Sequence, residues 1–158
     1  MTIDQPQAVQ DDGARAPVVA GVDGTGNDEL VLAWAAAEAQ RLGVALLAVH
    51  ALDLPSGVVA GGFSDRHEIL ATVRLERRGE AVRHALERVR TTHPDVETSM
   101  VDRWGTPAQE LVALGGRASA IVVGGGRKSG LAKLAVGSTS LAVAMHAPCP
   151  VVLVRAHT

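Results

Sequence analysis

The segment Pro17-Val-Val-Ala-Gly-Val-Asp-Gly-Thr-Gly-Asn27 contains the first strong structural signal of the chain. Its apolar half, 17–22, is short and uninterrupted, which predicts a strand buried on both faces. Asp23 ends this apolar run, and 24–27 has the glycine-rich composition of a turn. An Ala-rich segment that favours a helix follows over 29–42. A buried strand followed by a turn and a helix predicts an α/β fold.

The same alternation of apolar strands and helices continues to the end of the chain. The expected strands are 17–22, 44–52, 96–101, 118–123 and 150–154. The expected helices are 29–42, 64–91, 106–115 and 137–146. Because strands that alternate with helices form a parallel sheet covered on both faces, we predict one α/β layer sandwich. The third strand is expected near a sheet edge, and Asp53–Phe63 is expected to be a long loop.

Helix caps and buried stripes are predicted from residue type and spacing. The first helix is expected to bury Leu30, Trp34, Ala37 and the aliphatic stem of Arg41. The second helix is expected to bury Leu75, Val82, Leu86 and Val89. Thr25 is placed as the cap of the first helix, with Asp28 as a capping-box acid. Ser138 is placed as the cap of the last helix.

Composition excludes several classes of protein. The chain has 158 residues, 47% of them hydrophobic, and a net charge of −2, which excludes an overall basic nucleic-acid binder. Aromatic residues make up only 2%, too few for a base-stacking surface. Cys149 is the single cysteine, so no internal disulfide forms and a reducing compartment is expected.

Residues 1–16 are polar, so we expect a disordered N-terminal tail followed by one domain over 17–158. The tail lacks the apolar core of a signal peptide. No segment approaches 18 uninterrupted apolar residues, so no membrane contact is expected. The expected location is the cytoplasm.

The segment from Gly124 to Ser140 is the strongest candidate for a binding site. Ligands of open parallel sheets bind outside the carboxyl ends of the strands, where the strand order reverses. Glycines after a strand let backbone N–H groups approach an anion, and a helix N-terminus adds free donors. Arg127, Lys128 and Lys133 lie in the same segment. The pattern describes a phosphate cradle or, equally, a plain loop before a capped helix. It is not a Walker A loop, and the spacing of Gly21, Gly24 and Gly26 in the first turn is not that of a dinucleotide-binding fingerprint.

Four separate segments resemble those of universal stress proteins. They are Gly21-Val-Asp-Gly-Thr25, Leu47-Ala-Val-His-Ala51, Val122 through Ser138, and Ala147-Pro-Cys-Pro-Val-Val-Leu-Val154. The resemblance covers about residues 17–155. It implies a five-stranded parallel sheet in the order 3-2-1-4-5, sandwiched between helices, and a homodimer through the last strand.

The resemblance also implies an ATP site. Many members carry a glycine, two residues, a second glycine, nine residues, and a third glycine before Ser or Thr. Gly124 and Gly137 match the first and third glycines, whereas Arg127 stands at the second. The implied site residues are Gly21, Asp23, Ala51, Val123, Gly124, Arg127, Gly137, Ser138 and Thr139. Among them, Asp23 matches a contact to the adenosine part, and Ser138 lies at the phosphates.

These observations predict an adenine-nucleotide-binding regulator of the stress response, with ATP as ligand, with or without Mg²⁺, and an unidentified protein partner. Two alternatives stay open: a cyclic-AMP-binding member, and a nucleotide-free protein that has lost the site at Arg127. No catalytic base or set of metal ligands can be identified, so at most slow ATP hydrolysis is expected. His50 and Cys149 are expected to be packed residues without a catalytic or redox role.

Overall fold

The computed structural model describes residues 15–52, 65–125 and 136–155, with the side chains of 65–69 left out. The strands are β1 (Val18–Val22), β2 (Leu46–Leu52), β3 (Thr98–Trp104), β4 (Ala120–Gly124) and β5 (Val151–Val154). The helices are α1 (Asp28–Leu42), α2 (Asp65–Thr92), α3 (Pro107–Gly115) and α4 (Ser138–His146). The expected tail, the Asp53–Phe63 loop, Arg127, Lys128 and Lys133 lie wholly or almost wholly outside the described residues.

All five strands are parallel and lie in the order β3-β2-β1-β4-β5, which confirms the predicted fold class. β3 lies at an edge, as its half-exposed pattern predicts. Its boundaries are later than expected because Leu46 to Leu52 pair in register with Thr98 to Trp104. The chain leaves β1 toward β2 on one side and returns to β4 on the other. The strand order therefore reverses between β1 and β4.

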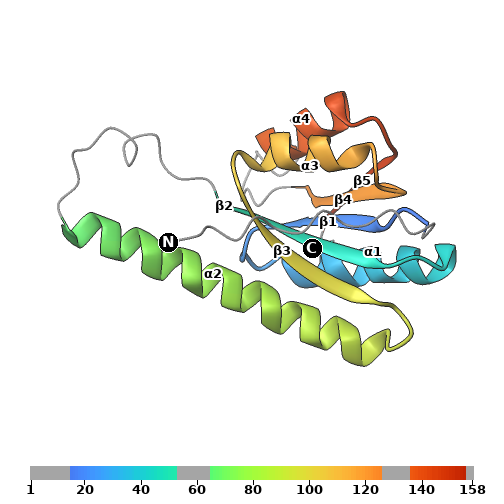
Figure 1. The fold of residues 1–158 in the computed structure, drawn as a ribbon, viewed down its shortest axis with the longest axis horizontal. Coiled ribbons are helices and arrows are strands. Elements are labelled where there is room, and N and C mark those ends of the chain that lie inside the picture. Colours follow the sequence, from blue (N-terminus) through green and yellow to red (C-terminus); the bar gives the residue numbers. More distant parts are fainter. Residues whose placement is uncertain (1–14, 53–64, 126–135, 156–158) are drawn as a thin grey trace, which may run out of the picture.

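Two helices cover each face of the sheet, α1 and α2 on one and α3 and α4 on the other (Figure 1). Side chains alternate between these faces along each strand. Val18, Ala20 and Val22 belong to the core beneath α1 and α2. Val19 belongs to the second core, with Leu111 of α3 and Val143 of α4. The site must therefore form at the open carboxyl ends of the strands, because both faces are filled.

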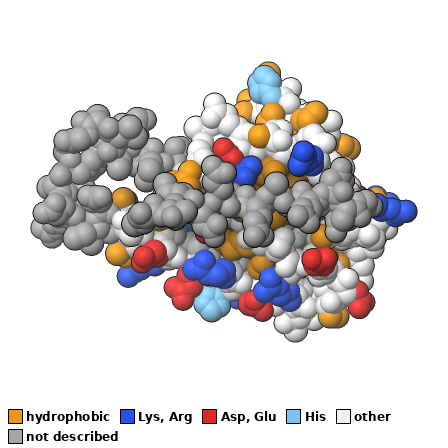
Figure 2. Space-filling view, viewed as in Figure 1, with side chains coloured by type: hydrophobic (Ala, Val, Ile, Leu, Met, Phe, Trp, Pro, Cys, Tyr) orange, Lys and Arg blue, Asp and Glu red, His pale blue; other side chains and the backbone are white. Residues whose placement is uncertain are grey.

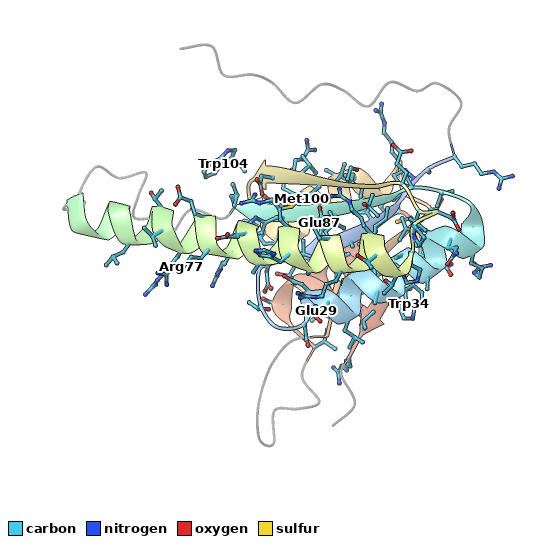
Figure 3. All side chains as sticks on the ribbon, turned by 90° about the horizontal axis from the view of Figure 1, so that it is seen from below. Glu29, Trp34, Arg77, Glu87, Met100 and Trp104 are labelled. Atoms are coloured by element: carbon cyan, nitrogen blue, oxygen red, sulfur yellow. The ribbon has the colours of Figure 1, made fainter. Side chains whose placement is uncertain are left out.

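The apolar stripe predicted for α1 is wrong. The helix buries Val31, Leu32, Ala35, Ala36 and Ala39. Trp34 is 39% exposed and lies at the periphery of the molecule (Figure 3), and Leu30 is similarly exposed. Because α1 packs against both the sheet and α2, the three alanines on its inward face allow a close approach. The stripe predicted for α2 is confirmed at Val82, Leu86 and Val89, with Leu75 half-buried.

The exposed face of α2 carries interspersed acidic and basic side chains (Figure 2), including the ion pair between Arg88 and Glu29 of α1. Within the described part of the chain, none of the helices is long and apolar enough to cross a membrane.

Candidate functional site

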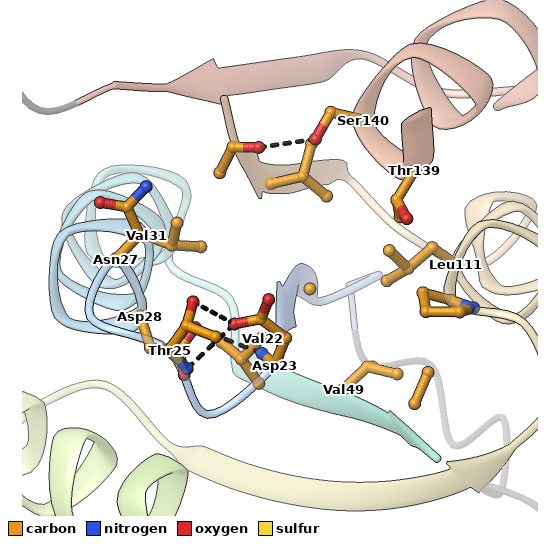
Figure 4. Close-up of a pocket in the computed structure, with 15 residues that line it drawn as sticks. Val22, Asp23, Thr25, Asn27, Asp28, Val31, Val49, Leu111, Thr139 and Ser140 are labelled. Atoms are coloured by element: carbon orange, nitrogen blue, oxygen red, sulfur yellow. Dashed lines mark hydrogen bonds between the residues drawn. The ribbon is translucent and has the colours of Figure 1, made fainter. Parts of the chain in front are cut away.

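A cavity of about 260 Å³ opens at the carboxyl ends of β1 and β4, where the strand order reverses (Figure 4). Its walls come from the ends of β1, β2 and β4 and from the first turns of α1, α3 and α4. The lining residues are Gly21, Val22, Asp23, Thr25, Asn27, Asp28, Val31, Val49, Ala51, Pro107, Leu111, Val123, Gly124, Thr139 and Ser140. This is the general position at which α/β sheets bind ligands.

The loop between β1 and α1 forms the acidic side of the cavity. One carboxylate oxygen of Asp28 accepts the backbone N–H of Gly24 at 2.7 Å, and the other accepts that of Asp23 at 3.2 Å. The Asp23 carboxylate accepts the backbone N–H of Thr25 at 3.0 Å and its hydroxyl at 2.5 Å. Asp23 is exposed to the cavity, whereas Asp28 is only 5% exposed. Hydrogen bonds to these two carboxylates therefore hold the conformation of the loop.

The N-terminal cap of α1 differs from the prediction. Asn27 holds the cap position, since its carbonyl accepts the N–H of Val31 at 3.1 Å. The Thr25 hydroxyl is engaged by Asp23 and does not cap the helix. Asp28 does reach back to loop N–H groups as a capping-box acid would, but these belong to Asp23 and Gly24.

Burial raises the pKa of Asp28 from 3.8 to about 6, against the lowering effect of the two hydrogen bonds that it accepts. The negative charge of Asp23 adds to the rise, and nearby His50 opposes it. The site thus holds a carboxyl group that changes its charge close to neutral pH.

The opposite wall, where β4 ends and α4 begins, carries hydroxyl groups. The Ser140 hydroxyl donates to the carbonyl of Gly124 at 2.6 Å and ties α4 to the end of β4. Thr139 projects toward the cavity on the side across from Asp23 (Figure 4). The first turn of α4 contains no acidic residue. The positive end of this helix dipole therefore faces the cavity without a carboxylate to neutralise it.

Between these two sides the cavity is apolar, with Val49, Ala51, Pro107, Leu111 and Val123 along it. Gly21 shapes this part, because a side chain there would bring its Cβ within 2.7 Å of Leu111 Cδ1. Leu111 is buried and occupies the space that glycine leaves free. The cavity therefore has an apolar slot between its two polar sides.

The structure brings six of the nine expected site residues together at the cavity wall. These are Gly21, Asp23, Ala51, Val123, Gly124 and Thr139. Gly137 and Ser138 lie at the start of α4 but do not line the cavity, and Arg127 falls in the part of the chain not described. Ser138 is the first helical residue and not the cap: Gly137 caps α4 and accepts the N–H of Leu141 at 2.9 Å.

Sequence reasoning missed the residues that the helices bring to the cavity. The sequence pattern assigns Asp28 only a helix cap, and it assigns no role to Asn27, Val31, Leu111 and Ser140. No local signal marks Asp28, because which side of α1 faces inward depends on how the helix packs. The position of Leu111 depends on how α3 packs, which the local sequence does not specify.

His50 and Cys149 occupy packed positions. His50 is 2% exposed, and its Nδ1 lies 2.9 Å from a carboxylate oxygen of Asp102 on β3. Cys149 is half-buried beside the second core, and burial raises the pKa of its thiol, so the reactive thiolate is disfavoured. Among the residues that the structure describes, no group of His, Cys, Asp or Glu side chains could hold a metal ion.

The fold and the cavity define a parallel α/β protein with a cavity at the reversal point of its sheet, where sheets of this kind bind ligands. The family model that matches residues 15–155 is that of the universal stress protein family. The chain belongs to this family, as its sequence resemblance predicts.

Curated relatives support the same assignment. Universal stress protein Rv2005c of Mycobacterium tuberculosis is 35% identical over 97% of this chain and 50% of its own length. A universal stress protein of Mycolicibacterium smegmatis is 31% identical over 94% of this chain and 48% of its own. The chain thus spans about half the length of these relatives.

Solved structures share the fold. The universal stress protein UspA from Lactobacillus plantarum has a TM-score of 0.67 and 21% identity, covering 90% of this chain and 99% of that one. A universal stress protein in complex with cAMP gives 0.64 and 21%, covering 91% and 99%. One from Archaeoglobus fulgidus in complex with dAMP gives 0.54 and 24%, covering 87% and 96%.

Proposed function

We propose that this protein binds an adenine nucleotide in the cavity between β1 and β4 and acts as a cytoplasmic regulator of the stress response. The observation that carries the proposal is the polarity of the cavity: an acidic loop on one side, an apolar slot, and an acid-free helix N-terminus on the other. These three regions match the hydrogen-bond donors of a nucleoside, the apolar faces of its base, and the phosphates. The cAMP and dAMP complexes of proteins with the same fold point to the same ligand class.

In this proposal the adenine lies in the slot beside Val49 and Leu111. Asp23 accepts hydrogen bonds from the ribose or the base, and the phosphates extend to Thr139 and the first N–H groups of α4. A volume of about 260 Å³ is slightly below the range of about 300–1,000 Å³ for ligand pockets, which suits a nucleoside whose phosphates extend beyond the cavity. ATP is the proposed ligand, and binding rather than hydrolysis is the proposed role.

The direct test is the melting temperature of the nucleotide-free protein with ATP, ADP, AMP and cyclic AMP, each with and without Mg²⁺. A ligand at about 100 times its Kd adds about 2.7 kcal/mol to the free energy of unfolding, which shifts the melting temperature measurably. The proposal expects a shift with at least one of these ligands. A cooperatively unfolding protein that responds to none of them would overturn it and favour a nucleotide-free role through protein contacts.

A matched pair of glycine variants locates the site. A Cβ at Gly124 would lie 3.5 Å from Val31 Cγ2, an ordinary contact, so Gly124→Val is expected to fold and to extend its methyl groups into the cavity. Nucleotide affinity should fall at least about tenfold. A Cβ at Gly116 would have nothing within 4 Å, and Gly116 lies outside the cavity, so Gly116→Val should bind like the wild type.

We further propose that β5 pairs two copies of the protein into a homodimer. β5 is an edge strand. Beside it, Leu141 and Met145 of α4 are 51% and 68% exposed, and Leu153 of β5 is exposed as well. An open edge flanked by apolar side chains favours strand pairing with another chain.

Light scattering tests the dimer. Leu141→Lys should yield monomers, whereas Leu70→Lys, which adds the same charge at an exposed leucine of α2, should leave the dimer intact. A monomeric wild-type protein at micromolar concentration would contradict the proposal.

A further inference from the structure

Asp28 is the one buried carboxyl group among the residues that the structure describes. It lines the cavity at the start of α1, yet it is turned away from solvent and toward the backbone of the preceding loop. Burying a charge is costly unless its hydrogen bonds are satisfied. The two N–H groups that this carboxyl group binds therefore indicate its role.

Those N–H groups belong to Asp23 and Gly24, the two residues at which the chain leaves β1 and turns. The turn then brings the Asp23 carboxylate round to accept the N–H and hydroxyl of Thr25. Asp28 thus fixes the loop, and the loop fixes the orientation of Asp23. Asp23 is the exposed member of the pair and faces the cavity.

We propose that ionised Asp28 is a positioning residue: it holds the β1–α1 loop in the conformation that presents Asp23 to the nucleoside part of the ligand. The inference rests on the proposed nucleotide site. A carboxylate suits this role because the two N–H donors bind different oxygens of Asp28, and an ionised acceptor makes the stronger hydrogen bonds. Asparagine offers one oxygen and would turn an NH₂ group toward one of the two donors.

The charged groups around Asp28 come from each element packed against it. Asp23 lies in the same loop, and His50 of β2 lies nearby with Asp102 of β3 behind it. α2 packs on the loop where Arg78 meets Gly24, and Arg83 lies close to His50 around Gly79. Asp23 disfavours the ionised form of Asp28, whereas His50 favours it. The loop is therefore held by a titratable carboxyl group, Asp28, that has both acidic and basic side chains around it.

Protonation of Asp28 removes one of its two acceptors. Because its pKa is raised to about 6, this loss occurs as the pH falls through that value. Ligand affinity is then expected to be full above pH 6 and to decrease below it. A merely structural carboxyl group would not give ligand affinity this pH dependence.

The test measures adenosine binding to the wild type, Asp28→Asn and Glu29→Gln by calorimetry across this pH range. Adenosine has no phosphate, so the ligand's own titration does not interfere. The wild-type affinity should fall about tenfold from well above to well below pH 6. Asp28→Asn should bind about tenfold more weakly at the higher pH and lose the pH dependence. Glu29→Gln, which removes the adjacent exposed acid outside the cavity, should follow the wild type.

Amide hydrogen exchange separates this inference from the proposed function. Without ligand and at one pH above 6, the N–H groups of Asp23 and Gly24 should exchange faster in Asp28→Asn than in the wild type or in Glu29→Gln. If no adenine compound binds the wild type, the nucleotide site is overturned, and the exchange result alone then decides the role of Asp28 in the loop. Unchanged protection of both amides, or unchanged affinity and pH profile in Asp28→Asn, would overturn the inference.

Discussion

Two helices begin at the rim of the same cavity, and their first turns have opposite chemistry. α1 starts with Asp28 and Glu29, so its positive dipole end is compensated by carboxylates of its own chain. α4 starts with hydroxyl residues and no acid. The two ends of the cavity therefore favour different groups of a ligand. An anionic group is favoured at α4, and a hydrogen-bond donor is favoured at α1. A nucleotide has these two ends, which supports the proposed orientation.

The largest effect is expected from breaking the loop on the α1 side. Gly24 has φ +74°, and a Cβ there would lie 2.5 Å from the Arg78 backbone of α2. Gly24→Ala should lower the free energy of unfolding by about 3 kcal/mol, since conformational strain and overlap add. Gly43 has φ +65° but open space around it, so Gly43→Ala should cost only about 1 kcal/mol. Urea denaturation measures both, and equal losses would show that α2 yields to the contact.

The next effect concerns the pH dependence of stability. Because its folded-state pKa of about 6 exceeds the ordinary 3.8, the folded protein holds the Asp28 proton more tightly than the unfolded chain. The stabilisation from this proton is full below the ordinary pKa and is lost as the pH rises through 6, by about 2 kcal/mol and at most about 3. Asp28→Asn should lack this slope, so its stability relative to the wild type should increase with pH. Parallel stability curves for the two proteins would contradict the expectation.

A smaller effect is expected when α4 is given the chemistry of α1. Thr139→Asp places a carboxylate at the start of α4, so affinity for a phosphorylated nucleotide should fall about tenfold, or about 1.4 kcal/mol. Adenosine affinity should change little. Ala144→Asp, an equal charge on an exposed residue late in the same helix, is the control. Equal losses for adenosine and nucleotide in Thr139→Asp would show that the phosphates do not lie at α4.

The smallest effect belongs to Glu29, the exposed acid of the α1 turn. Its ion pair with Arg88 of α2 is exposed on both sides, so Glu29→Gln should cost less than about 1 kcal/mol. Nucleotide affinity should not change, because Glu29 does not line the cavity. Thermal unfolding and calorimetry check the two statements, and a loss of affinity would mean that charge near α1, rather than the contacts of Asp28, governs the site.

Four of the strands could be predicted from sequence because each one is a short apolar run bounded by turn residues, and β3 could be predicted from the alternation of its residues. The 3-2-1-4-5 order came from the family resemblance, since local patterns do not specify which strands pair. The inward face of α1 was not predictable by size: Ala35, Ala36 and Ala39 are buried, whereas Trp34 is half outside. Which residues of α1 are buried depends on how closely the helix approaches both α2 and the sheet.

The candidate site also contains residues that could be predicted from sequence and residues that could not. Asp23 and Gly124 lie where strands end, and Thr139 lies where a helix begins. Their place at the carboxyl ends of the strands was therefore predictable. Asp28 and Ser140 act through backbone groups, namely the loop N–H groups and the Gly124 carbonyl. Such partners carry no residue signature, because any residue type offers the same N–H or C=O. Contacts of this kind emerge only when the chain is folded.

The length of α2 has a mechanical consequence. Its 28 residues span about 42 Å, whereas the seven residues of β3 span about 23 Å, so the N-terminal part of the helix extends past the sheet (Figure 1). Gly24 bears on the helix at Arg78, about 20 Å from its first residue. The β1–α1 loop thus contacts α2 near the midpoint of the helix. Because the helix is continuous, its first turns would move with any rotation about this contact.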